Sequence, residues 1–247
     1  MQLIALPDFP LIEPGDDLVA AIRAALNRAA LELSEGDVLV VAQKIVSKAE
    51  NRYVNLNEVV VGDKAKTLAV ETGKDPRLVQ LVLDESVAVL RHRPGVLIVE
   101  HCNGYVHANA GIDQSNIEHQ PNNPRALLLP KDPDASAARL RSGLGGSVNV
   151  IINDTAGRAW RNGVVGFALG TAGFDPVVNL VGEHDLFGNT LKITQVAVAD
   201  ELAAAASFVM GQAAQATPVV LIRGARLTLS TETSAKLIRQ RAHDLFR

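Results

Sequence analysis

Runs of mainly apolar residues recur along the chain, separated by polar segments that contain proline or glycine. Three such runs, residues 38–42, 148–152 and 218–222, are typical of buried strands. Apolar positions at helical spacing, together with many alanines in the second case, predict helices over residues 18–33 and 195–210. The chain therefore combines buried strands with amphipathic helices.

The order of these elements indicates the fold class. Asp16 or Asp17 can cap the helix that begins at Leu18, and Asp134 can cap a helix over residues 135–144. The remaining expected elements are helices over 63–72, 75–85 and 234–245 and strands over 87–91 and 96–100. Because several strands follow one another directly, we expect an α+β fold with mixed or antiparallel sheets and packed helices. No linker or repeat divides the sequence, so one unit over residues 1–247 is expected, without a boundary that the sequence places.

Composition and charge exclude several kinds of partner. The net charge is −3 and no polybasic segment is present, which argues against nucleic acid and against an anionic membrane. No apolar run approaches the roughly twenty residues of a membrane span, and no secretory signal is apparent. The single cysteine, Cys102, fits a reducing compartment. We therefore expect a cytoplasmic protein.

Two carboxylates that follow apolar segments are the strongest candidates for chemistry. Asp113 lies in the stretch 108–116, whose small and polar residues are unsuited to a core and let a ligand approach the backbone. Asp154 follows the apolar run 148–152 after one residue and precedes Thr155. Oxygen ligands of these types suit hard divalent cations. Our working hypothesis is that Asp113 and Asp154 converge on one metal–phosphate site.

Lysines and histidines near these segments carry weaker signals. Lys44 and Lys48 follow the buried run 38–42, where they either bind an anionic ligand or begin a solvated helix, and the sequence supports both interpretations equally. His101 and His107 flank an expected turn. Histidines in such places are more often hydrogen-bonded structural groups than ligands, so neither is assigned to the site.

An arginine pair shortly after Asp154 is interpreted as functional. Arg158 or Arg161 can pair with a carboxylate or a phosphate, whereas the alternative is a packed Trp160 between surface arginines. The pattern does not decide which arginine acts. The glycine-rich segment 166–173 matches neither the phosphate loop nor the dinucleotide fingerprint, so it indicates close strand packing and turns.

A series of short segments, none decisive alone, occurs in a specific order along nearly the whole chain. They are Pro10-Leu11-Ile12 with Gly15-Asp16-Asp17, Gly36-Asp37-Val38, Val46-Ser47-Lys48-Ala49-Glu50, residues 108–116, Asp154-Thr155 with Gly157-Arg158 and Trp160-Arg161, Asp185-Leu186-Phe187-Gly188, Ala199-Asp200-Glu201-Leu202, and Val209-Met210-Gly211. Taken together, these segments resemble the coenzyme F420-0:L-glutamate ligase (F420-0:γ-glutamyl ligase) family.

The resemblance implies a nucleotide site for GTP that lacks a classical phosphate loop. The implied nucleotide contacts are Phe9, Pro10, Leu11, Ile12, Gln43, Lys48 and Asn116, with a segment from Met210 through Gly211, Gln212 and Ala213 to about Thr217 closing over the nucleotide. It also implies that Asp113 and Asp154 hold one divalent metal, Mg²⁺ or Mn²⁺, with Thr155 and Gln212 at a second. The resemblance further allows a potassium ion, and it implies a two-lobed subunit in an intertwined homodimer.

The implied activity is GTP-dependent addition of L-glutamate to F420-0 in F420 biosynthesis. The γ-phosphoryl group of GTP moves to a carboxylate of F420-0, and the amine of L-glutamate then displaces phosphate. Asp113, Asp154 and Lys48 are the expected catalytic residues, because phosphoryl transfer needs positioning and charge neutralisation.

Three positions depart from the family pattern. Gln43 stands where a serine or threonine is common, and Gln212 stands where a carboxylate would bind a cation more strongly. His107 stands where a cysteine is expected. Three alternatives stand beside the ligase: a related ligase for a different carboxylate acceptor, a non-catalytic protein that binds GTP and metal, and, from the bare carboxylates, a metal-dependent phosphohydrolase.

Overall fold

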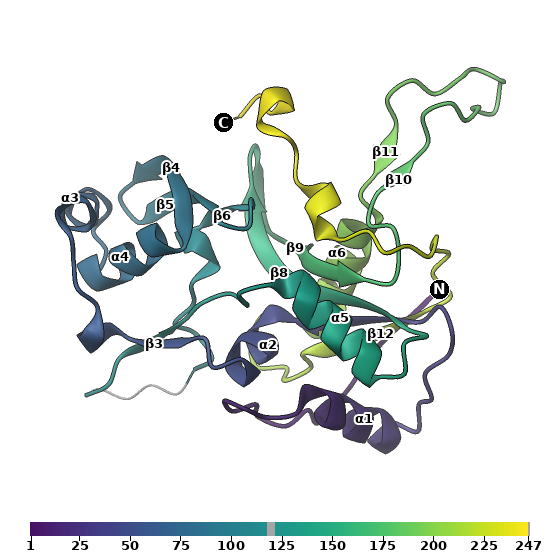
Figure 1. Ribbon diagram of the computed structural model, residues 1–247, viewed down its shortest axis with the longest axis horizontal. Helices are drawn as coiled ribbons and strands as arrows, with labels where there is room; N and C mark the ends of the chain where they lie inside the picture. The colour runs from purple at the N-terminus through teal and green to yellow at the C-terminus, as the bar shows by residue number, and fades with distance from the viewer. Residues whose placement is uncertain (118–121, 247) are drawn as a thin grey trace.

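A five-stranded mixed sheet forms the centre of the molecule in the computed structural model, which describes residues 1–117 and 122–246. The strand order is β1-β12-β2-β8-β9, and β2 and β8 run parallel while the other neighbours in this sheet run antiparallel (Figure 1). The strands are β1 (Gln2–Ala5), β12 (Val219–Arg223), β2 (Val38–Ala42), β8 (Asn149–Arg158) and β9 (Arg161–Ala172). The expectation of an α+β fold with mixed sheets is confirmed.

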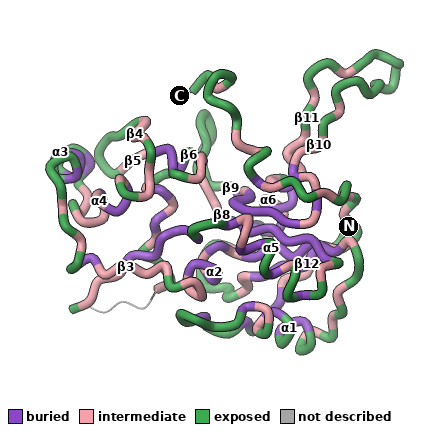
Figure 2. The backbone as a smooth tube through the Cα atoms, in the orientation of Figure 1, coloured by how far each residue is buried: buried purple, intermediate pink, exposed green. Residues whose placement is uncertain are grey.

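Helices cover both faces of this sheet, which explains its uninterrupted apolar strands. Along β2, Leu39 and Val41 join the core under α1 (Leu18–Arg28), α2 (Gln43–Ala49) and α5 (Pro133–Gly143). Val38 and Val40 join the core under α6 (Val198–Met210) on the other face. Side chains of successive strand residues point to opposite faces, so a strand buried on both sides, such as β2, is apolar throughout. The buried residues concentrate in these central strands (Figure 2).

A smaller part of the chain, residues 53–112 and 125–128 (here the small part), has a hydrophobic core of its own. Its helices α3 (Asp63–Thr72) and α4 (Pro76–Asp84) pack on a three-stranded antiparallel sheet of β4 (Ser86–Arg93), β5 (Val96–His101) and β6 (Val106–Ala108). The remaining elements of the small part are β3 (Tyr53–Asn55), β7 (Arg125–Leu127) and the 3₁₀ turns η1 (Leu56–Glu58) and η2 (Asn109–Gly111).

A long two-stranded arm and the C-terminal segment lie outside these two parts. The arm consists of β10 (Val178–Asn179) and β11 (Gln195–Val196) with the loop between them, and it projects far from the body (Figure 1). After β12 the chain forms two short 3₁₀ turns, η3 (Ser234–Leu237) and η4 (Arg241–His243). No helix in the described part of the chain is long and apolar enough to cross a membrane.

The glycine-rich segment serves close packing, as its sequence indicates. A side chain at Gly166 would approach the Ala203 carbonyl oxygen of α6 to 2.6 Å, and one at Gly170 would lie 2.3 Å from the Pro133 carbonyl carbon of α5. Both distances are shorter than any carbon side chain tolerates, so β9 depends on glycine to fit between the two helices.

Four expectations for helices need correction. The first helix ends at Arg28 and not near residue 33, because Ala30 adopts a left-handed conformation. The helix expected from residue 195 begins at Val198, since Gln195–Val196 pairs with β10. Asp132, not Asp134, caps α5 by accepting a hydrogen bond from the Ala135 amide. The closing helix over 234–245 is wrong, because tertiary contacts of Ser234 and Arg241 hold this segment in two separate turns.

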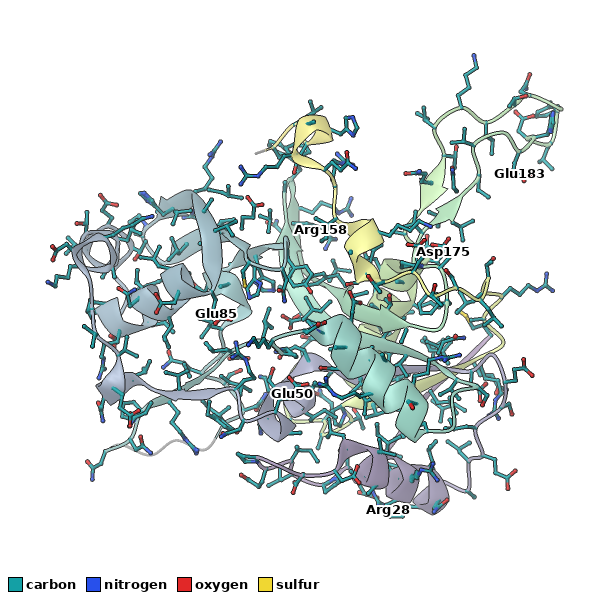
Figure 3. The ribbon with its side chains drawn as sticks, viewed as in Figure 1. Arg28, Glu50, Glu85, Arg158, Asp175 and Glu183 are labelled. Carbon is teal, nitrogen blue, oxygen red and sulfur yellow. The ribbon has the colours of Figure 1, made fainter. Side chains whose placement is uncertain are left out.

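An ionic network joins the small part to the large sheet. Arg52, just after α2, donates to Glu85 at 2.9 Å and to the Leu129 carbonyl at 2.8 Å. Glu85 lies on the side of the small part that faces the large sheet (Figure 3), and His101 Nε2 is 3.7 Å from the same carboxylate oxygen. His101 and Arg52 hold the pKa of Glu85 below its usual value despite partial burial. The carboxylate is therefore charged when the protein is folded.

Removal of this charge is expected to weaken the connection. In Glu85→Gln, the half-buried Arg52 loses its anion, so the free energy of unfolding at pH 7 should fall by about 1–3 kcal/mol. The folded pKa of Glu85 is lowered, so its contribution is full above the unfolded pKa and is lost as the pH falls through the folded value. Urea denaturation of the wild type and variant should therefore differ at neutral pH and converge in acid. Glu35→Gln, in an exposed loop, is the matched control, and a difference that persists in acid would contradict the prediction.

Candidate functional site

A pocket of about 500 Å³ lies at the edge of the large sheet where the parallel strands β2 and β8 end. Ligands of open α/β sheets commonly bind outside the carboxyl ends of parallel strands. The register brings Ala42 of β2 beside Asn153 of β8, so Gln43 and Asp154 leave the sheet as neighbours. Ala42 also donates its amide to the Pro218 carbonyl at 2.8 Å, which brings the segment before β12 to the same edge.

Every nucleotide, metal and catalytic residue that the family resemblance implies lines this pocket, whereas Arg158 and Arg161 do not; the roles of these residues stay predictions. The lining includes Phe9, Pro10, Leu11, Ile12, Gln43, Lys48, Asp113, Asn116, Asp154, Thr155, Met210, Gly211, Gln212 and Ala213. Lys44, Asn153 and the segment 214–218 line it as well. The set comes from the segment after β1, the start of α2, the end of β8, the segment before β12 and the loop after η2.

The backbone before Asp113 is strained in a way that aims this carboxylate at the pocket. Asn109, Ala110 and Gly111 all have positive φ angles, of 52°, 54° and 69°. A side chain at Gly111 would fall 2.7 Å from Leu129, so glycine is required there. Asp113 then exchanges two backbone hydrogen bonds with Leu127, of 3.0 and 2.9 Å, which fix its position.

Asp113 is held in its charged form by Lys44 and Ser115. Lys44 Nζ lies 2.6 Å from Asp113 Oδ2, and the Ser115 amide donates to Oδ1 at 2.6 Å. Burial raises the pKa of Asp113, but these two neighbours outweigh burial and bring the pKa below its usual value. The ammonium group of Lys44 is thus the positively charged partner of Asp113.

Asp154 has a partner that the sequence did not assign to the site. His107 Nε2 in β6 lies 3.2 Å from Asp154 Oδ2, and both side chains are largely buried. His107 Nδ1 is 2.9 Å from the Ala108 carbonyl, which can only accept, so Nδ1 carries a proton. Burial lowers the pKa of His107, but the charge of Asp154 outweighs it and raises the pKa above its ordinary value. The interpretation of His107 as a structural group at a turn is incomplete, because β6 lies in contact with β8 and brings the ring to Asp154.

Thr155 points to the other side of β8 from Asp154. Its hydroxyl lies 3.3 Å from Gln212 Oε1, and Gln212 Nε2 donates to Ser207 Oγ of α6 at 3.0 Å. Thr155 and Gln212 therefore already share a hydrogen bond, so the structure brings together the two residues expected at a second metal.

Lys48 and Gln43 lie on the face of α2 that borders the pocket. Lys48 makes no side-chain hydrogen bond or ion pair with the described residues, and burial chiefly lowers its pKa, with Lys44 adding to this and Glu13 opposing it. Gln43 is almost fully buried, and its Oε1 accepts a hydrogen bond from Ser47 at 2.9 Å. Lys48 is thus available to an anionic ligand, whereas Gln43 is held in place from within its own helix.

The donor atoms of the pocket fit a hard divalent cation. Asp113, Asp154, Thr155 and Gln212 offer only oxygen ligands from their carboxylate, hydroxyl and amide groups, as Mg²⁺ and Mn²⁺ prefer. The other cluster of metal-ligand types in the described residues, Glu85, His101 and Cys102, fits less well. There His101 Nδ1 accepts the Asn103 amide and Arg52 already pairs with Glu85.

Comparison with known proteins places the chain in a family. The family model described as F420-0:Gamma-glutamyl ligase matches residues 8–224. The chain belongs to this family. A curated relative from Methanothermobacter thermautotrophicus, "Coenzyme F420:L-glutamate ligase", is 44% identical over 253 residues, which covers 100% of this chain and 99% of the relative.

Other members of the F420-0:γ-glutamyl ligase family align over most of their length as well. Proteins of the same description from Methanopyrus kandleri and Methanocaldococcus jannaschii are 44% and 40% identical to this chain. These alignments cover 96% and 87% of this chain and 93% and 86% of the relatives. The resemblance found in the sequence is thereby confirmed at the level of the family.

The His107–Asp154 pair makes this family member's stability depend on a positive charge beside Asp154. In His107→Gln, the buried carboxylate loses that charge, and the free energy of unfolding without metal should fall by about 1–3 kcal/mol. Mn²⁺ bound at Asp154 would replace the charge, so the deficit should shrink when Mn²⁺ is added. Thermal unfolding with and without Mn²⁺ measures this. His92→Gln, a partly exposed histidine in β4, is the control, and an equal deficit in both conditions would contradict the prediction.

Proposed function

We propose that this chain is a GTP-dependent ligase that joins L-glutamate to coenzyme F420-0 by an amide bond, through an acyl phosphate, in F420 biosynthesis. Family membership and the descriptions of the curated relatives support the substrates. The observation that carries the proposal is that one pocket is lined by Asp113, Asp154 and Lys48, which come from three separate segments. Phosphoryl transfer requires this combination of charge neutralisation and positioning.

The pocket has complementary regions for a nucleotide. Phe9 and Ile12 are buried and give it an apolar wall, while Leu11 is exposed at the rim. Lys48 provides a positive charge, and its ammonium group can offset the negative charge of the phosphates. We place GTP between this wall and the segment 210–217, with its phosphates toward α2 and β8.

Asp113, Asp154, Thr155 and Gln212 would hold two divalent cations in this proposal. Such cations would supply positive charge that stabilises the transferred phosphoryl group. Gln212 carries no charge, so the second cation is held more weakly than the first. Lys44, which pairs with Asp113, would lie next to a cation held by this carboxylate.

The reaction consists of two displacements. A carboxylate oxygen of F420-0 attacks the γ-phosphorus of GTP, and the bond to the bridging oxygen breaks as GDP leaves. The α-amine of L-glutamate then attacks the acyl carbon, phosphate leaves, and the amine proton passes to phosphate or water. The protein residues act by orienting the reactants and by holding charge, and no general base is assigned.

A ligation assay tests this function. Purified protein with GTP, Mn²⁺, L-glutamate and F420-0 should yield a product whose mass has increased by one glutamyl residue or more. Asp113→Asn and Asp154→Asn should abolish the product, and Lys48→Ala should raise the KM for GTP about tenfold or more through loss of a charged contact. Asp63→Asn, an exposed aspartate at the start of α3, is the control.

Each alternative gives a distinct result in this assay. Turnover with another carboxylate acceptor and none with F420-0 would indicate a related ligase. Binding of GTP without phosphate release would indicate a non-catalytic protein, and GTP cleavage without L-glutamate would indicate a phosphohydrolase. Wild-type turnover by either aspartate variant would remove that residue from the site.

We also propose that two copies of the chain form the expected homodimer through the projecting arm. Leu186 and Phe187 lie in a turn at Asp185 on this arm, and their exposed fractions are 100% and 90%. Ile193 on the same arm is 89% exposed. Apolar side chains gathered on a projecting segment are typical of a surface that a partner covers.

Loss of these side chains should dissociate the dimer. Leu186→Ser combined with Phe187→Ser removes the apolar surface of the arm, so sedimentation velocity should show the variant as a monomer and the wild type as a dimer. Val70→Ser, at an exposed position on α3, should leave the dimer intact. A wild type that sediments as a monomer would overturn the proposal.

A further inference from the structure

A second cavity of about 280 Å³ lies beside the far end of the β8–β9 hairpin. Strand β8 passes from one cavity to the other, since Asp154 and Thr155 line the first and Ala156, Gly157 and Arg158 line the second. Figure 3 shows Arg158 on this hairpin, close to the C-terminal segment. The two cavities are thus connected by a single extended strand.

The register of the hairpin places Asp154 and the second cavity on the same face. Phe167 is opposite Asp154 and Val165 is opposite Ala156, and both of these β9 residues line the second cavity. A strand rises about 3.3 Å per residue, so Arg158 lies roughly 13 Å beyond Asp154 along β8. A ligand that spans both positions must be elongated.

The cavity is lined by aromatic and apolar side chains. The rings of Tyr105 and Phe167 pack edge to face with centroids 6.2 Å apart. The Tyr105 hydroxyl donates to the Leu169 carbonyl at 2.7 Å, and burial raises its pKa, so the ring stays neutral. Leu237 and Ile238 from the C-terminal segment form the opposite wall. This lining suits a flat apolar ring.

Charged groups at the cavity favour an anion. The Arg158 guanidinium makes no hydrogen bond or ion pair with any residue that the structure describes, and Arg239 lies on the same cavity. Asp200 is the acidic residue of the lining; its Oδ1 accepts the Ala168 amide at 2.9 Å, and burial raises its pKa. The guanidinium of Arg158 therefore offers a positive charge to an anionic ligand in this cavity.

The C-terminal wall of the cavity is fixed by several contacts. Ser234 Oγ donates to the Leu169 carbonyl at 2.8 Å, and the Ser234 amide donates to Asp134 Oδ1 at 3.0 Å. Arg241 pairs with Glu100 of β5, and the ring of Phe246 lies 6.4 Å from that of Trp160 at the hairpin turn. These contacts hold the segment against the sheet, the small part and the hairpin, so the fold itself fixes this wall of the cavity.

We propose that the second cavity binds the ring-bearing, anionic body of the carboxylate acceptor, with Arg158 contacting its negative charge, while the acceptor carboxylate reaches Asp154. This inference rests on the proposed function, in which the acceptor is the deazaflavin F420-0. Free L-glutamate has no ring for the aromatic lining and is too short to reach from Asp154 to Arg158. The structure also separates the two candidate arginines, because Arg158 lines the cavity and Arg161 does not.

Two variants with matched controls test the assignment by steady-state ligation. Arg158→Ala removes the cation, and Val165→Phe fills the cavity from β9. Each should raise the KM for F420-0 about tenfold or more, while the KM values for GTP and L-glutamate stay within about twofold. Arg161→Ala and Val164→Phe change the same residue types at exposed neighbouring positions outside the lining and should leave all three KM values within about twofold.

Calorimetric titration of F420-0 into each protein gives a second readout that needs no turnover. Weaker F420-0 binding in Arg158→Ala and Val165→Phe, with GTP binding unchanged, supports the assignment. A wild type that ligates F420-0 while both variants keep its KM would overturn the assignment and leave the proposed function standing. A raised KM for L-glutamate alone would indicate that the second cavity binds L-glutamate, and this result would also overturn the assignment. If the wild type neither binds nor ligates F420-0, the proposed function itself fails.

Discussion

The parallel pairing of β2 with β8 is the constraint on which the site depends. This pairing sets Ala42 beside Asn153, so the lysines of α2 and the carboxylate of Asp154 leave the sheet at one edge. The antiparallel neighbours add the segment after β1 and the segment before β12 to the same edge. Helices on both faces bury these strands, and the buried sheet gives a rigid base to residues that lie far apart in the sequence.

Charge is balanced across the pocket by protein groups alone. Lys44 pairs with Asp113, and His107 pairs with Asp154, so neither carboxylate faces the pocket without a cation. This arrangement avoids the large free-energy cost of unpaired buried charge. It also places both carboxylates at the pocket, where the proposed reaction needs divalent cations.

The small part supplies one of these groups and directly precedes a second, although its core is separate from that of the large sheet. Asp113 follows η2, and His107 lies in β6. The position of the small part therefore controls the geometry of the site, and the network of Arg52, Glu85 and His101 helps to fix that position. Two separate hydrophobic cores can in this way contribute to one site, provided that specific contacts fix their relative position.

The sequence by itself determined what depends on local pattern. The buried strand at 38–42 follows from its continuous apolar run and the helix at 63–72 was expected at its observed bounds, while Asp113 and Asp154 stand out because each carboxylate follows an apolar segment. The family resemblance then named the residues that the structure gathers in one pocket. Local sequence encodes these features because side-chain period and turn chemistry act over a few residues.

Only the tertiary structure decided which distant groups meet. The contact of His107 with Asp154 needs β6 to lie beside β8, and the choice of Arg158 over Arg161 as a lining residue needs the C-terminal segment to return to the hairpin. Asp134 resembles a helix cap, but it instead binds Thr171 and Ser234, and Asp132 takes the cap. In each case the contact depends on which of several residues, far apart in the sequence, the fold brings close. A local sequence pattern carries no information about that choice.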